Sequence, residues 1–94
     1  MTRKKTYEIG TAVRITTMLS LSSPTSVKIT IKDSANVSMV SAVDMTGDTT
    51  SIYSYIYQSN TTDNTGEYTI IIDAVYGSYN SRAISYFTLV DNDL

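Results

Sequence analysis

The chain has 94 residues, which is enough for one domain and too few for two hydrophobic cores. It contains no cysteine and no histidine, which excludes disulfides, thiolate zinc sites and catalysis by thiols or imidazoles. The formal net charge of -2 argues against nucleic acid as a partner, and no apolar stretch approaches the ~20 residues that a membrane helix needs.

The first six residues are predicted to form a flexible basic arm, because Arg3, Lys4 and Lys5 are the only cluster of positive charges. Such an arm either keeps the chain soluble or touches an acidic surface of a partner. No apolar segment follows it, so no secretory signal is expected. Residues 91–94 are predicted to be a polar tail, which leaves residues 7–90 for the folded domain.

Strands are predicted throughout this domain, because residues that favour strands are abundant and apolar residues alternate with polar ones. The clearest alternation places Val27, Ile29 and Ile31 on one face of a strand. Helical periodicity is not found. The segment from Thr46 to Asp48 is interpreted as a break between strands. In chain order, the predicted strands span residues 7–10, 13–21, 27–32, 37–43, 52–58, 68–75 and 82–90.

About seven short strands separated by regular turn signals predict an antiparallel β-sandwich, and a small barrel would share this pattern. One hydrophobic core is expected, made by the inward faces of these strands. Its predicted residues are Val13, Ile15, Val27, Ile29, Ile31, Tyr55, Tyr68, Ile70, Ile72, Phe87 and Leu89.

The most specific motif is Gly66-Glu67-Tyr68 at the start of a predicted strand. A tyrosine at this place resembles the tyrosine corner of immunoglobulin-like sandwiches, in which the ring is buried and the hydroxyl bonds to the preceding loop. Ile70 stands two residues further on, where antibody domains have cysteine. The predicted fold is therefore an all-β, immunoglobulin-like sandwich of about seven strands without a disulfide, with Gly66 and Tyr68 as its structural corner.

A second resemblance covers most of the chain. It begins with the segment from Tyr7 to Ile15, continues from Pro24 to Asp33, and includes Ile52 to Tyr55 and Gly66 to Tyr68. This order is similar to small immunoglobulin-like proteins of tailed phages and archaeal viruses, and to domains of prokaryotic cell-surface proteins. The resemblance implies a structural or adhesive role, and it brings no catalytic residues with it.

Two surface features are candidate partner contacts. Tyr76 and Tyr79 flank the tip of the last predicted hairpin, where rigid aromatic rings offer contact area at a low entropic cost. The basic cluster of the arm is the other candidate. The aspartates are expected to be solvated, with calcium at a loop rim as the alternative, although no segment follows the calcium-loop pattern. No catalytic residue, metal ligand or cofactor is predicted.

We therefore expect a non-enzymatic structural module, most simply a capsid-decoration or tail-associated protein on a virion surface. A start at Met1 without a signal peptide suits a particle protein made in the cytoplasm. Its partner would be the protein lattice of a capsid or tail, or further copies of itself as a homo-oligomer, and an exposed edge strand is one means of assembly. The alternative is a module of a prokaryotic adhesin or other extracellular protein that binds a glycan or a protein at the cell surface.

Overall fold

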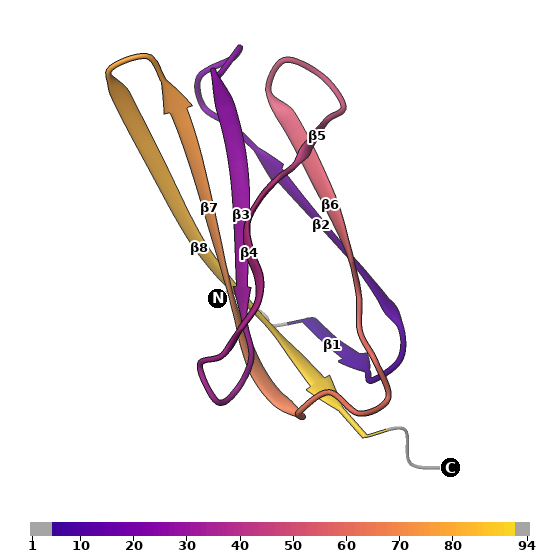
Figure 1. Cartoon of the computed structure of the whole chain (residues 1–94). Coiled ribbons are helices and arrows are strands. Elements are labelled where there is room, and N and C mark those ends of the chain that lie inside the picture. Colours follow the sequence, from indigo (N-terminus) through magenta and orange to yellow (C-terminus); the bar gives the residue numbers. More distant parts are fainter. Residues whose placement is uncertain (1–4, 92–94) are drawn as a thin grey trace.

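The computed structural model describes residues 5–91, and every regular element in this range is a β-strand, so no helix there crosses a membrane. The strands are β1 (Lys5–Glu8), β2 (Ala12–Met18), β3 (Ser26–Lys32), β4 (Ser38–Asp44), β5 (Thr46–Gly47), β6 (Ile52–Gln58), β7 (Gly66–Tyr76) and β8 (Tyr79–Val90). One sheet has the order β1-β8-β7-β3-β4 and the other the order β2-β6-β5. The two sheets face each other as two layers (Figure 1).

The predicted all-β class is confirmed, and the alternation of side chains explains it. In β7, every second residue from Tyr68 to Ala74 is buried, whereas the residues between them are only half-buried. In β3, Val27, Ile29 and Ile31 are buried as the sequence pattern predicts. Strands with this pattern bury one face each, so two sheets enclose a single core.

The core draws residues from both sheets. Tyr68 stacks on Phe87 with ring centroids 5.1 Å apart, and Tyr57 approaches both rings from the opposite sheet at 6.3 Å. Tyr57 is therefore the core tyrosine of β6, and Tyr55, which was predicted there, is only half-buried. The buried hydrophobic residues are Val13, Ile15, Val27, Ile29, Ile31, Val40, Met45, Tyr57, Tyr68, Ile70, Ile72, Ala74, Phe87 and Leu89.

Three features of the predicted strand pattern need correction. The described residues form eight strands instead of about seven, because Thr46–Gly47 is a short strand, β5, where a break was predicted. The fold is not wholly antiparallel, since β1 runs parallel to β8 with Lys5 opposite Phe87. Lys5 and Thr6, which were predicted as part of the flexible arm, lie in β1 and pair with β8 in this sheet.

An irregularity in β4 gives this edge of the five-stranded sheet a local strain. The register between β3 and β4 shifts around Thr30, and Ala42 has a φ of 51°. The Thr30 hydroxyl accepts a hydrogen bond of 3.1 Å from the N–H of Ala42. Left-handed backbone is unfavourable for residues that carry a Cβ atom, so this bulge is held by its neighbours against an intrinsic cost.

Candidate interaction surface

The predicted tyrosine corner lies in the core at the start of β7. Tyr68 is fully buried, and its hydroxyl donates a hydrogen bond of 2.7 Å to the carbonyl oxygen of Asn64. Burial raises the pKa of Tyr68 to about 12, because a phenolate loses its hydration there. Gly66 has a φ of 118°, and a Cβ atom on it would lie 2.9 Å from the Cβ of Ser34. Only glycine therefore lets the loop pack this closely.

A buried aspartate joins this corner to a second loop. Asp33 accepts hydrogen bonds at Oδ1 from the N–H groups of Ala35 and Val37, each at 2.9 Å. Its Oδ2 accepts a hydrogen bond of 3.0 Å from the side-chain amide of Asn64. The hydrogen bond from Val37, more than any other contact, holds the pKa of Asp33 below its usual value. The link to Asn64 gives Asp33 a structural role that the sequence analysis did not assign.

The remaining polar groups at this end of the molecule are similarly engaged. The hydroxyl of Tyr57 donates a hydrogen bond of 2.8 Å to Oδ2 of Asp63, and burial is the main cause that raises its pKa. Ser59 is buried, accepts from the N–H of Gly10 and donates to the carbonyl oxygen of Thr11. These side chains stabilise the loops at this end of the molecule.

The two tyrosines of the β7–β8 tip have different surroundings. Tyr76 is half-buried, packs against the core and donates a hydrogen bond of 2.7 Å from its hydroxyl to the carbonyl oxygen of Leu21. Tyr79 is 73% exposed. Tyr79 thus has the character expected of a contact residue, whereas Tyr76 ties the tip of the hairpin to the loop before β3.

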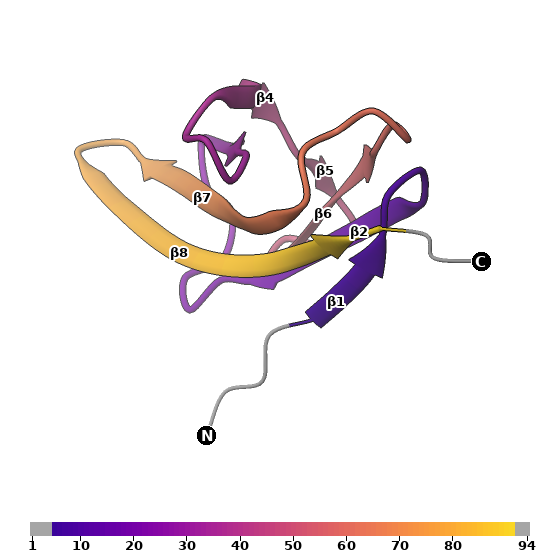
Figure 2. The same ribbon diagram turned by 90° about the horizontal axis from the view of Figure 1, so that it is seen from below.

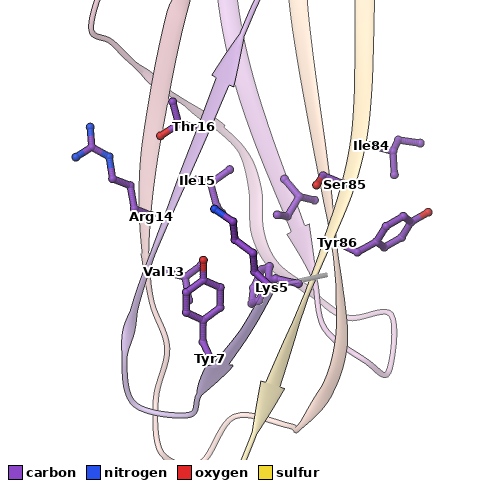
Figure 3. Close-up of a pocket in the computed structure, with 11 residues that line it drawn as sticks. Lys5, Tyr7, Val13, Arg14, Ile15, Thr16, Ile84, Ser85 and Tyr86 are labelled. Carbon is purple, nitrogen blue, oxygen red and sulfur yellow. The ribbon is translucent and has the colours of Figure 1, made fainter. Parts of the chain in front are cut away.

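Of the predicted basic arm, Arg3 and Lys4 lie outside the described residues. Lys5 begins β1, and its side chain reaches from the end of that strand into a hollow between the two sheets (Figure 3). It is exposed and forms no ion pair within the described range. Arg14, by contrast, lies on the rim, points away from the hollow in Figure 3, and is 3.8 Å from Asp48.

This hollow has a volume of about 570 Å³. It lies between β2, an edge strand of its sheet, and β8, directly beyond the first residue of β1. Its floor is apolar and consists of core side chains, namely Val13, Ile15, Ile70 and Phe87. Acidic residues are absent from its lining, and Lys5 supplies a positive charge inside it.

Within residues 5–91, β1 is much shorter than β8, which leaves the hollow uncovered. In this range β1 pairs with the stretch from Phe87 to Val90, at the carboxyl end of the twelve residues of β8. Figure 2 shows β1 beside this end, and among the described residues no strand lies on the outer side of β8 from Tyr79 to Ile84. Every residue from Tyr79 to Tyr86 is exposed. An exposed edge of this length is a template for pairing with another strand.

The direction of the backbone groups along this edge follows from the pairing with β1. The carbonyl oxygen of Val90 accepts a hydrogen bond of 2.9 Å from the N–H of Ile9, so the backbone groups of Val90 point away from β7. Backbone groups alternate sides along a strand. The N–H and C=O groups of Asn80, Arg82 and Ile84 therefore point to the open side, where the described residues provide no partner strand.

Two further ion pairs lie on the five-stranded sheet. Arg82 donates to Asp73 at 2.7 and 3.3 Å, which raises the pKa of the guanidinium. Lys28 lies 3.2 Å from Asp44. No group of three or more acidic side chains comes together within residues 5–91 to hold a metal ion.

The structure thus brings one predicted contact residue, Lys5, into the hollow and places Tyr79 at the far end of the same exposed edge. The sequence analysis did not identify the hollow itself, although the mismatch in length between a four-residue entry strand and a long last strand is visible in the sequence. Comparison of the chain with models of protein families, with curated proteins and with solved structures found no match.

Proposed function

We propose that the fold is immunoglobulin-like and of the variable type. If β2 is the B strand, the sheet β2-β6-β5 follows the order B-E-D, and the run β8-β7-β3-β4 follows the order G-F-C-C′. Tyr68 then stands near the start of the F strand, which is the place of a tyrosine corner. Ile70 fills the core where antibody domains place a cysteine.

We propose further that the chain is a non-enzymatic interaction module that binds another protein at the open edge of β8. The observation that carries this proposal is the hollow of about 570 Å³ beside a stretch of β8 that has no partner strand on its outer side within residues 5–91. The polar side chains of the loops support it as well, because Asp33, Ser59 and Asp63 form hydrogen bonds that hold the loops together. The virion surface is the proposed setting, and it rests on the sequence resemblance to phage and archaeal-virus proteins.

A photo-crosslinking experiment in the cells or particles that naturally contain the chain tests this function. A benzophenone amino acid replaces Ile84 on the β8 edge in one variant, and Ile56 in the other. Ile56 is a matched control because it is 62% exposed but lies on the opposite sheet. We expect a protein adduct from position 84, recovered with virus particles, and little from position 56. Equal yields, or none, would refute the β8 edge as the contact, and adducts confined to the cell envelope would replace the virion by a cell-surface role.

A further inference from the structure

The shape of the β8 edge defines the kind of partner that fits it. We infer, on the basis of the proposed function, that the partner adds an extended strand to the open stretch of β8, and that its inward face carries aliphatic side chains followed by a carboxylate. The hollow is the socket for these inward side chains. Such strand addition uses main-chain hydrogen bonds for affinity and side-chain pockets for specificity.

β1 already shows how this edge receives a strand. It lies parallel to β8, and its inward residue Tyr7 packs edge-to-face against Phe87 with ring centroids 6.1 Å apart. The hollow begins where β1 ends, so an added strand would continue the same line along the edge. The N–H and C=O groups of Arg82 and Ile84 point toward the place where the added strand would lie.

The floor of the hollow determines the inward side chains. Ile15 and Ile70 come from opposite sheets and are both at least nine-tenths buried beneath it. An aliphatic side chain of the added strand would lie over them and remove apolar surface from water. A charged side chain at this position fits less well, because its charge would lose hydration against apolar surface.

The positive charge of Lys5 determines which side chain is favoured at the next inward position of the added strand. Lys5 projects from the first residue of β1, so its ammonium group lies at the junction between β1 and any added strand (Figure 3). No acidic residue lines the hollow. A carboxylate on the partner would therefore meet a cation that forms no ion pair among the described residues and lies next to apolar surface, where a pair is less screened than one in open water.

The probe for this inference is the peptide acetyl-Val-Thr-Val-Ile-Glu-Thr-amide, whose inward positions in parallel register carry valine, valine and glutamate. It is titrated into the full chain and followed by amide chemical shifts. Two analogues serve as controls, one with lysine in place of glutamate and one with N-methyl groups on alternate residues, which cannot pair with an edge. We expect shifts along β8 and in β2 near Ile15, tighter binding of the glutamate form by about fivefold at low salt, and no binding of the N-methylated form.

Variants of the chain separate the backbone contribution from the charge. Ile84→Pro removes one N–H from the open edge and leaves the ladder to β7 intact, so it is expected to weaken binding about tenfold, whereas Ile84→Val keeps it. Lys5→Glu is expected to reverse the preference between the glutamate and lysine peptides. Lys32→Glu makes the same charge change on β3, outside the hollow, and is expected to leave the preference unchanged.

The inference is overturned if the glutamate peptide does not bind, if the N-methylated peptide binds equally, or if Lys5→Glu leaves the preference unchanged. If position 84 crosslinks to a protein but the glutamate peptide does not bind, the proposed function stands and the addition of a partner strand is refuted. Peptide binding without any crosslink in the natural setting would refute the proposed function instead.

Discussion

Removal of the Tyr68 hydroxyl measures how much the corner hydrogen bond contributes to the fold. In Tyr68→Phe the ring keeps its stacking on Phe87, but the carbonyl oxygen of Asn64 loses its donor at 2.7 Å. Asn64 is exposed, so water partly replaces the hydroxyl. We expect a loss of about 1–2 kcal/mol in the free energy of unfolding. For a domain of this size, that loss lowers the Tm by about 5–15 °C.

The assay is urea and thermal unfolding, with Tyr55→Phe as the matched control. Tyr55 is half-buried, and its hydroxyl makes no hydrogen bond within the described residues, so this control is expected to change stability by less than about 0.5 kcal/mol. Each variant differs from the natural chain by the loss of one tyrosine hydroxyl. Equal stabilities of Tyr68→Phe and Tyr55→Phe would refute the assigned role of the corner.

The same variant carries a prediction for alkaline pH. The pKa of Tyr68 rises from 10.0 to about 12 on folding, so the folded chain holds this proton more tightly than the unfolded chain does. Its contribution to stability is complete below pH 10 and is lost as the pH rises from 10 to 12. The natural chain should therefore lose stability more steeply than Tyr68→Phe over this window. Parallel pH profiles would contradict the buried, neutral phenol.

Three further predictions concern the loops and edges. Asp33 has a lowered pKa in the folded chain, so its contribution to stability is present above pH 3.8 and is lost as the pH falls through the folded pKa. In urea unfolding, the stability of Asp33→Asn should therefore depend less on acid pH than that of the natural chain. An unchanged dependence on pH would contradict this. Ala42→Gly should raise the unfolding free energy by about 0.5–1 kcal/mol, since it relieves left-handed strain, and a loss of stability would refute the strain. Ser85→Pro should lower the free energy of unfolding by at least about 2 kcal/mol, because the N–H of Ser85 faces β7. Ile84→Pro should lower it by less than half as much, because the N–H of Ile84 faces the open side. Equal losses of stability in thermal unfolding would show that the alternation of backbone groups along β8 is assigned wrongly.

The strands and most of the core were predictable because their signal is local. A period of two residues is visible in any window of β3 or β7, and the burial of Ile29 and Ile70 follows from it. Tyr55 and Tyr57 share one face of β6, so the pattern could not decide which ring lies deeper. That depends on Phe87 in the opposite sheet, 6.3 Å from Tyr57.

The features that the sequence analysis missed depend on distant partners. β5 has two residues, too few for a periodic pattern, and it exists because β6 pairs with it. The parallel pairing of β1 joins residues that are more than eighty positions apart. The hydrogen bond between Asp33 and Asn64 joins residues 31 positions apart, so no local pattern predicts it. The two hydrogen bonds from backbone N–H groups to Oδ1 of Asp33 are local, and an aspartate at the start of a turn is a signal for them. The hollow arises only when β1 and β8 lie side by side.

The most direct test of the open β8 edge is amide hydrogen exchange, residue by residue, with and without the glutamate peptide. In the free chain, the N–H groups of Arg82 and Ile84 should exchange quickly, while those of Ala83 and Ser85, which face β7, should be protected. Saturation with the peptide should protect Arg82 and Ile84 as well. Protection of Ile84 in the free chain, or its continued fast exchange in the complex, would contradict the proposal that a partner strand pairs with this edge.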